Sequence, residues 1–351
     1  MMQKIIDKVI ADERICDDDY RTLEQTADLH TLGFLADTIR RRKHENKNVT
    51  YVIDRNINYT DICVSACKFC AFYKGPEDKA GYLLSLEEIG EKIKETQELG
   101  GTQILLQGGL HPDLPLEYYE KMVRFMRDTG IHVHGFSPPE IHHFAEISGL
   151  SIKTVIERLI DAGLGSIPGG GAEILSDRVR ELAAPKKCSA DEWLKVMTTA
   201  HHLGLRTTAT MMFGHIETKE ERLEHLRRIR NTQDETGGFT AFIPWPFQPD
   251  NTVYADIEKT SAFEYIKTLA LSRIYLDNID NIQASWVTQG PKVAQLSLSF
   301  GANDFGSTMI EENVVAAAGV SFRLSEQEIR RLVVDAGFKP RQRLMDYTLV
   351  N

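Results

Sequence analysis

The fold is decided by a unit that residues 85–109 show in full, SLEEIGEKIKETQELGGTQILLQGG. Ser85 and Glu88 have the spacing of a capping box, which predicts the start of a helix. Gly100 and Gly101 stand where the helical pattern stops. The apolar run at residues 103–107 then predicts a buried strand. A helix that leads through a glycine turn into a strand is the repeating unit of parallel sheets with helices outside them.

The same unit recurs between residues 50 and about 306. Ser189 with Glu192 and Thr218 with Glu221 repeat the capping box. The candidate strands occupy residues 50–58, 103–107, 132–136, 166–168, 207–213, 239–244, 282–287 and 295–300. Eight strands that alternate with helices predict an α/β fold, a (β/α) barrel of the TIM type. The last two strands are the least regular, because the helix between them would be too short.

Helical segments flank the predicted barrel. Residues 1–48 have an amphipathic helical pattern that ends in the basic run 40–43, and positive charge suits a helix C-terminus. We interpret that run as a solvated helix end and not as an anion site. Ser325 and Glu328 open one more helix. We therefore expect an N-terminal helical extension over 1–48, a barrel over 49–320, and a C-terminal appendage packed on the barrel over 321–351.

The composition excludes several classes of function. The chain has 351 residues, with 41 Lys and Arg against 51 Asp and Glu, and a formal net charge of −10. This acidic balance argues against nucleic-acid binding. The longest apolar stretches, such as 314–320, fall short of the roughly 18 residues of a membrane span. The N-terminal residues lack the apolar core of a secretory signal. We expect a cytoplasmic protein that binds neither nucleic acid nor membrane.

Three of the five cysteines, Cys63, Cys67 and Cys70, lie within eight residues directly after the first candidate strand. Active-site residues of such barrels lie in the loops that follow strands. Three thiolates can hold three irons of a 4Fe–4S cluster. Because that cluster normally takes four cysteines, one iron would stay open for an added ligand. Two alternatives remain open: a zinc site, and an electron-transfer cluster closed by Cys16 or Cys188.

The C-x3-C-x-aromatic-C spacing, with Phe69 as the aromatic residue, resembles the radical S-adenosylmethionine (SAM) superfamily. Further segments resemble its menaquinone-biosynthesis branch, namely RNINYT (55–60), CAFY (70–73), QGG (107–109), FSPPEI (136–141), PGGGAE (168–173), TATMM (208–212), AFIPW (241–245) and GAND (301–304). The resemblance implies a 4Fe–4S cluster held by Cys63, Cys67 and Cys70, with SAM bound to the open iron.

The resemblance also implies where SAM would bind. The expected contacts come from Phe69, Phe72, Gln107, Gly108, Gly109, Ser137 and Glu173. Many superfamily members have Gly-Gly-Glu where this chain has Gln-Gly-Gly, so either Gln107 or a backbone carbonyl would meet the SAM amino group. Glu173 follows three glycines and is the nearest match to a ribose-binding carboxylate. A surface role for Glu173 stays open.

The branch implies a ring closure in the futalosine route to menaquinone, with dehypoxanthine futalosine as the substrate. The deoxyadenosyl radical takes the C4′ hydrogen, the carbon radical adds to the benzoate ring, and loss of an electron and a proton restores aromaticity. An electron donor such as flavodoxin or ferredoxin is implied as a partner.

The residues that would serve this reaction beyond the cofactors are less marked in the sequence. His111 and Glu140 follow candidate strands and are candidate proton acceptors. Arg178, Asn303 and Asp304 are candidate substrate contacts, with an N-cap role for Asp304 left open. Two other functions remain alternatives: an aminofutalosine synthase, which adds the radical to its substrate, and a non-catalytic iron–sulfur electron carrier.

Overall fold

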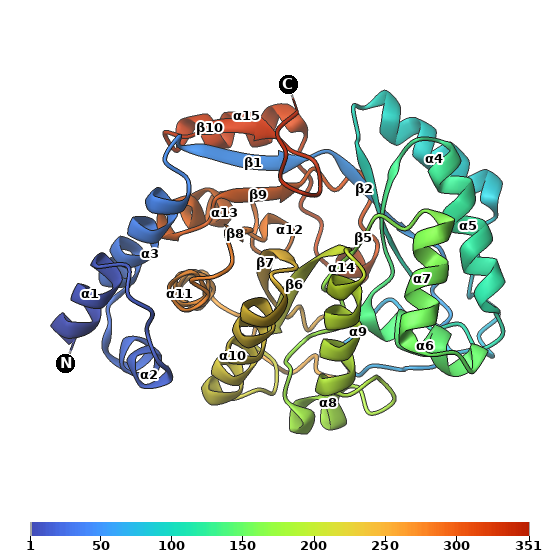
Figure 1. Cartoon of the computed structure of the whole chain (residues 1–351), viewed down its shortest axis with the longest axis horizontal. Helices are drawn as coiled ribbons and strands as arrows, with labels where there is room; N and C mark the ends of the chain where they lie inside the picture. Colours follow the sequence, from blue (N-terminus) through green and yellow to red (C-terminus); the bar gives the residue numbers. More distant parts are fainter. Residues whose placement is uncertain (1, 351) are drawn as a thin grey trace.

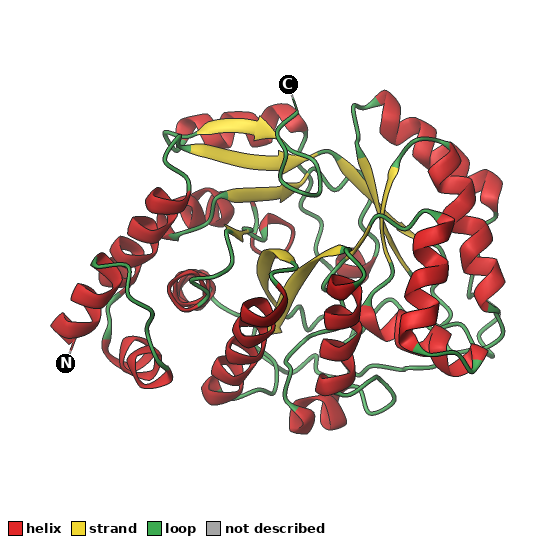
Figure 2. Ribbon diagram, viewed as in Figure 1, coloured by secondary structure: helices red, strands yellow, loops and turns green. Residues whose placement is uncertain are grey.

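A computed structural model describes residues 2–350, in which a curled parallel sheet forms an inner wall with helices around it (Figures 1 and 2). Its seven strands lie side by side in chain order: β2 (Asp54–Asn58), β3 (Gln103–Gln107), β4 (His132–Gly135), β5 (Ser166–Ile167), β6 (Arg206–Phe213), β7 (Phe239–Pro246) and β8 (Asn281–Ile282). Every pairing is parallel. The predicted α/β barrel architecture is therefore confirmed.

Helices return the chain between these strands. They are α4 (Leu86–Glu98), α5 (Leu116–Asp128), α6 (Pro138–Ser148), α7 (Ile152–Ala162), α8 (Asp177–Ala183), α9 (Ala190–His202), α10 (Lys219–Thr236) and α11 (Ala262–Tyr275). The capping boxes predicted at Ser85, Ser189 and Thr218 are present. Each satisfies two backbone N–H groups that a helix start leaves unpaired, so these local signals fix the helix positions.

A second sheet closes the ring. It contains β10 (Lys339–Gln342), β1 (Asn48–Val52) and β9 (Asp304–Ser307), in that order and all parallel. Ile53 alone separates β1 from β2, and a parallel bridge between Gln283 and Asp304 joins the end of β8 to β9. The predicted strand 50–58 is thus two strands, one in each sheet.

The last two predicted strands are largely wrong. Within the predicted strand 282–287 only Ile282 belongs to a strand, β8, and residues 286–289 form the short helix α12 (Trp286–Gln289). Residues 295–300 lie in α13 (Pro291–Ser297) and the 3-10 turn η1 (Leu298–Phe300). The apolar–polar alternation of 295–300 imitates a strand, but the buried side chains Ala294, Ser297 and Leu298 have helical spacing. The strand that closes the ring is β9, which carries too few apolar residues to stand out.

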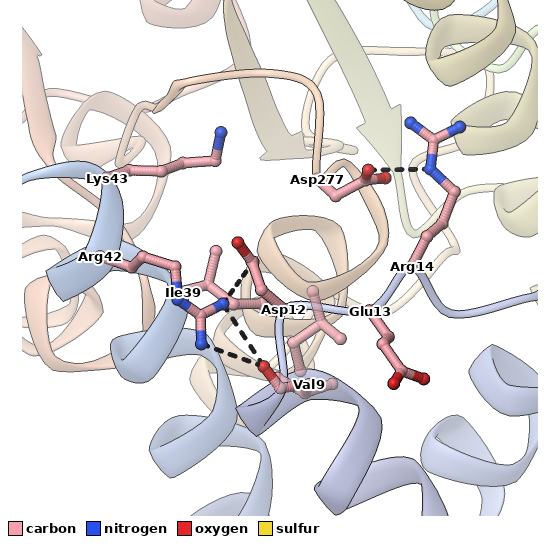
Figure 3. A pocket seen from close by; sticks show the side chains of 9 residues that line it. Val9, Asp12, Glu13, Arg14, Ile39, Arg42, Lys43 and Asp277 are labelled. Atoms are coloured by element: carbon pink, nitrogen blue, oxygen red, sulfur yellow. Dashed lines mark hydrogen bonds and ion pairs between the residues drawn. The ribbon is translucent and has the colours of Figure 1, made fainter.

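The N-terminal extension is helical as predicted, with α1 (Met2–Ile10), α2 (Asp17–Thr26) and α3 (Leu29–Lys43). Its basic end is only partly solvated, which corrects our interpretation: Arg41 is exposed, but its neighbours Arg40 and Arg42 are engaged by the protein. Arg42 donates to the carbonyls of Val9 and Ile10 and pairs with Asp12, beside a polar cavity of about 280 Å³ (Figure 3). Arg40 is buried over the ring of Phe338. These cations are used to fasten the helices together and to the C-terminal segment.

The C-terminal segment contributes more than the predicted helix. Besides α14 (Val314–Ala317) and α15 (Glu326–Asp335), it supplies β10, which pairs with β1 from Asn48 opposite Lys339 to Tyr51 opposite Gln342. Its last residues also send Arg343 and Met345 to the wall of the cavity inside the barrel. Within residues 2–350, no helix combines the length and the apolar character that crossing a membrane requires.

Candidate active site

The cysteine loop, residues 63–70, begins five residues after β2 ends. Its backbone is hydrogen-bonded to three neighbouring segments. Cys63 N donates to Lys74 O (2.9 Å), Val64 N to Leu110 O (3.0 Å), and Lys68 N to Ala183 O (2.9 Å). Leu110 follows β3 and Ala183 ends α8, so the loop lies on the carboxyl side of the sheet, where barrel enzymes carry their active sites.

The three loop cysteines are free thiols with restricted access. Cys67 is buried, and Cys63 and Cys70 are half-buried. Burial raises the pKa of Cys67 to about 11, although Lys187 and a hydrogen bond from Ser65 oppose the shift. Burial also raises the pKa of Cys70, against hydrogen bonds from the backbone N–H groups of Phe72 and Tyr73. The site thus favours neutral thiols until a strong positive charge, such as that of bound iron, compensates the thiolates.

The donor set suits a cluster with three protein ligands. Among residues 2–350, no three His, Cys, Asp or Glu side chains converge on a point where a single metal ion could be held. A cubane cluster does not need its ligands to converge on one point, because each thiolate binds a different iron. Cys188 is buried against Arg180, whose Nη2 lies 3.6 Å from its sulfur, and Cys16 is exposed at the start of α2.

The ends of β3 and the cysteine loop are in close contact. A Cβ added to Gly109 would lie 2.2 Å from the carbonyl oxygen of Ile62, and one added to Gly108 would lie 2.5 Å from the ring of Tyr59. Only glycine therefore allows β3 to end against the residue that precedes Cys63. Gln107 lines the barrel cavity, and its amide lies against the Cα of Gly170. The expected SAM contacts Gln107 and Gly108 thus lie between the cysteine loop and the glycine loop.

The glycine loop, residues 168–173, is held from both sides. Gly169 N donates to Thr208 Oγ1 (2.9 Å), and Gly169 O accepts from Thr210 Oγ1 (2.6 Å). Trp193 Nε1 donates to Gly170 O (3.1 Å). The loop ends at Glu173, which has a φ of +41°, a conformation that costs energy outside glycine. The carboxylate of Glu173 is therefore placed by a rigid backbone.

Glu173 is not a free surface carboxylate. Its oxygens lie 3.0 Å from Lys187 Nζ and 3.5 Å from Arg180 Nη1. Lys187 Nζ in turn lies 5.3 Å from the centre of the Phe69 ring in the cysteine loop. Two expected SAM contacts, Glu173 and Phe69, are therefore joined through one cation. Lys187 was not among the residues that we singled out as cofactor contacts.

Glu140 is fully buried, and its carboxylate already accepts hydrogen bonds from protein groups. Its carboxylate accepts from the backbone N–H (2.7 Å) and hydroxyl (2.6 Å) of Ser137, from the hydroxyl of Tyr59 (2.7 Å) and from Gly108 N (3.0 Å). Burial raises its pKa and these hydrogen bonds oppose the rise. Glu140 thus fixes the start of α6, through Ser137, and the end of β3.

The other candidate side chains lie apart from the barrel cavity. His111 is half-buried and accepts from Asp113 N (3.1 Å). Arg178 is exposed and paired with Glu221 at 2.6 Å. The ring of Phe72 lies edge-on to Tyr82 at 6.4 Å. None of these three residues lines the cavity.

Asn303 and Asp304 form the seam of the barrel and are also absent from the cavity wall. Asn303 Oδ1 accepts from Arg273 Nη2 (2.6 Å) and Ile282 N (2.9 Å). Asp304 accepts from Thr50 Oγ1 (2.9 Å) and pairs with the buried Arg343. Asp304 begins a strand and caps no helix, which corrects the N-cap alternative.

The cavity itself has a volume of about 270 Å³ and runs along the inside of the barrel. Gln107, Gly169 and Gly170 line its end near the cysteine loop, and Asp54, Gln103 and Arg343 line the opposite end. Apolar walls come from Leu105, Ile243, Trp245 and Trp286. A cavity of this kind can hold a small molecule and limit the access of water to a reactive intermediate.

The three-cysteine loop at the carboxyl side of a parallel barrel is accompanied by a sequence match over residues 57–229 to the radical SAM superfamily. The chain belongs to that superfamily and is a radical SAM enzyme. Residues 236–351 match the CofH/MqnC C-terminal region. Within the superfamily, the chain belongs to the branch that carries this region.

Enzymes of known name align along nearly the whole chain. Cyclic dehypoxanthine futalosine synthase from Streptomyces coelicolor is 46% identical over 99% of this chain and 88% of that enzyme. The enzyme of the same name from Halalkalibacterium halodurans is 44% identical over 99% of this chain and 94% of its own length. Aminodeoxyfutalosine synthase from Thermus thermophilus is 41% identical over 97% of this chain and 93% of that enzyme.

Solved structures support the fold. Methylornithine synthase (PylB) has a TM-score of 0.75 at 20% identity and covers 96% of this chain and 97% of its own. HydG from Carboxydothermus hydrogenoformans, a maturase of FeFe-hydrogenase, has a TM-score of 0.77 at 18% identity, over 99% of this chain and 80% of its own. Their likeness concerns the barrel and its terminal extensions.

Proposed function

We propose that this enzyme is a radical SAM cyclase that converts dehypoxanthine futalosine to cyclic dehypoxanthine futalosine in the futalosine route to menaquinone. The observation that carries the proposal is the identity of 46% and 44% with two enzymes of that name, each over 99% of the chain. The cavity inside the barrel supports it, because an electron carrier needs no cavity for a substrate.

Cys63, Cys67 and Cys70 would hold the cluster, and SAM would bind the fourth iron. Held by these three residues, the cluster would supply the one-electron reduction and oxidation that the reaction requires. Gln107, Gly108 and Glu173 would hold SAM, with Phe69, Phe72, Gly109 and Ser137 around them. The interval between the cysteine and glycine loops suits this role, because Gln107 contacts Gly170 and Lys187 joins Glu173 to Phe69.

The substrate would lie in the barrel cavity, with its ribose toward the two loops. The walls would hold the sugar against the aryl ring, so that the carbon radical meets the ring and not solvent. Arg178, Asn303 and Asp304 could act on the substrate only from outside the cavity wall. Polar cavity residues such as Thr208, Gln283 and Arg343 are better placed to meet its hydroxyl and carboxylate groups. A flavodoxin or ferredoxin would supply the first electron.

The test is anaerobic product analysis with SAM, a reductant and substrate deuterated at C4′. We expect free 5′-deoxyadenosine that carries the deuterium, and a product lighter than the substrate by one deuterium and one hydrogen. Aminodeoxyfutalosine synthase activity is the second candidate, because the Thermus thermophilus enzyme is 41% identical. A covalent adenosyl adduct of an enolpyruvyl benzoate, without turnover of dehypoxanthine futalosine, would favour that candidate instead.

A further inference from the structure

The proposed cyclisation must pass a proton from the aryl ring to the protein, and few groups in the cavity wall can accept it. The ionisable residues that line the cavity are Asp54, His134, Glu312 and Arg343. Asp54 accepts from Gln103 Nε2 (2.7 Å) and from Ser307 Oγ. Glu312 accepts from the backbone N–H groups of 314, 315 and 316 at 2.8–3.0 Å. Arg343 is a cation without an acceptor lone pair.

His134 differs from these groups. It is 6% exposed and lines the cavity from the middle of β4. Its Nδ1 lies 2.7 Å from the hydroxyl of Ser166, the residue directly opposite on β5. Within residues 2–350, the Nε2 atom of His134 makes no hydrogen bond. It is also not one of the polar atoms that are both buried and without a partner, so it must be accessible. Nε2 therefore opens toward the cavity.

The hydroxyl of Ser166 also contacts a second histidine. His132 Nε2 lies 2.8 Å from Ser166 Oγ, on the same face of β4 two residues before His134. The His132 ring is held against the backbone of Gly165, because a Cβ there would lie 2.4 Å from ring carbon Cε1. Solvent exposure increases from His134 through Ser166 to His132: the first two residues are buried and His132 is half-buried. Asp346, whose charge acts on His132, is exposed.

We propose that His134 is the proton acceptor of the cyclisation and that Ser166 and His132 relay the proton to the protein surface. This inference rests on the proposed function. The cyclised radical breaks one aryl C–H bond and gives the proton to His134 Nε2. The electron of the same step goes to the oxidised iron–sulfur cluster. His134 Nδ1–H passes its proton to Ser166, the hydroxyl proton moves to His132 Nε2, and His132 releases its Nδ1 proton toward Asp346 and solvent.

The electrostatics at His134 favour passing the proton on over keeping it on the imidazole ring. Burial lowers the pKa of His134 to about 3, with smaller contributions from the charges of His132 and Arg343. The imidazole is therefore neutral, and able to accept a proton, at neutral pH. Because the cation is unfavourable there, the proton must move on, and Ser166 provides the only hydrogen-bonded exit among the described residues.

The first arm of the test does not need catalysis. Nitrogen-15 NMR of the histidine-labelled full chain should show His134 neutral, with its proton on Nδ1 and none on Nε2. Ser166→Ala should shift the His134 Nδ1 resonance, whereas Ser148→Ala, at a hydroxyl that bonds only to helix carbonyls of α6, should not. A proton on Nε2 in the unaltered chain would overturn the relay, whatever the enzyme's substrate.

The second arm separates hydrogen abstraction from deprotonation. In His134→Gln, 5′-deoxyadenosine should still form and carry the C4′ deuterium, while the cyclised product formed per deoxyadenosine falls about 100-fold, the range for loss of a general base. Ser166→Ala and His132→Gln should lower the same ratio less. His225→Gln is the matched control, since His225 is also buried but does not line the cavity.

The outcomes are distinct. An unchanged product-to-deoxyadenosine ratio in a folded His134→Gln protein would overturn the role of His134. If His134→Gln fails to fold, the ratio in His132→Gln decides, because that ring is half-buried and its loss perturbs packing less. If the unaltered chain gives no cyclised product, the proposed function fails. The NMR experiment alone then tests the hydrogen bonds of His134, Ser166 and His132.

Discussion

At the scale of single residues, the proposed cluster assigns three of the five cysteines as iron ligands and leaves two without a role. Replacing Cys63, Cys67 or Cys70 by Ala should abolish SAM cleavage, because each would supply an iron ligand. Cys188→Ala should keep the reconstituted cluster, although this thiol is as restricted in access as Cys67. Iron and sulfide content with the optical spectrum of anaerobically reconstituted protein gives the measurement. A Cys188→Ala chain without a cluster would disprove the three-ligand assignment.

Glu173 offers a second residue-scale prediction. If its carboxylate binds the ribose of SAM, Glu173→Gln should weaken SAM binding by about 1–3 kcal/mol, the range for a hydrogen bond to a charged group. Equilibrium binding of SAM to the reconstituted protein measures the effect, with Glu181→Gln on the exposed side of α8 as the control. Unchanged affinity would mean that Glu173 only anchors Lys187 and Arg180.

The candidate site residues that could be proposed from the sequence are neighbours along the chain. The cysteines share one loop, so their spacing was sufficient to propose them as cluster ligands. Pairs that form only in three dimensions were not accessible: Glu173 with Lys187, Asp304 with Arg343, and the histidines of β4 with Ser166. For the last group a signal existed, since His132 and His134 alternate along a predicted strand and must face the same side.

At the scale of elements, the contact between β3 and the cysteine loop depends on Gly109. Gly109→Ala would place a methyl group 2.2 Å from the carbonyl oxygen of Ile62 and 3.0 Å from Cys63 Cβ. We expect the loop to shift, with a cost of about 1–3 kcal/mol and reduced cluster loading, although all three cysteines remain. Gly75→Ala is the control, because a Cβ there meets nothing within 4 Å. Full iron content in Gly109→Ala would contradict this view of the contact.

The link between α8 and α10 predicts a pH dependence. Glu221 accepts from Arg178 and also caps α10 through Thr218, and these contacts lower its pKa to about 2, with the Arg178 hydrogen bond as the largest cause. A lowered carboxyl pKa stabilises the folded state above the ordinary value of 4.5, and that stability is lost as the pH falls toward 2. Since Arg178 is half exposed, we expect about 1–2 kcal/mol.

Urea unfolding between neutral pH and the acid limit measures this contribution. The free energy of unfolding of Glu221→Gln should be lower than that of the unaltered chain at neutral pH and should fall less steeply on acidification. Glu87→Gln, an exposed first-turn residue of α4, is the control. Parallel acid curves for Glu221→Gln and the unaltered chain would refute the prediction.

Helices with capping and glycine signals in their own sequence were predictable. Elements that form only because a neighbouring strand or helix packs against them were not. Capping boxes and glycine stops located the helices of the barrel, since they satisfy backbone groups locally. The closing strand β9 has four residues, DFGS, and pairs only because β1 lies beside it. Residues 295–300 show the opposite failure, where alternation predicted a strand but packing selected a helix.

For the whole molecule, stability depends on the seam where the C-terminal segment meets the barrel. Asp304 is fully buried, and its partner Arg343 is 4% exposed. Asp304→Asn would leave a buried guanidinium without its counter-charge, and such losses cost about 3–5 kcal/mol. Chemical denaturation measures the cost, with the exposed Asp335→Asn as the control. The double replacement with Arg343→Met should recover part of it, and a cost equal to that of Asp335→Asn would show that the pair is dispensable.

The pairing of β10 with β1 also bears on how the chain is made. During synthesis β1 emerges from the ribosome long before residues 339–342, the partner that covers one of its edges. Until then β1, whose sequence NVTYV is largely buried in the folded protein, has an unpaired edge with which a strand of another chain could pair. Covering of this edge is therefore a late event in the making of the chain, and until then the strand is exposed to pairing with other nascent chains.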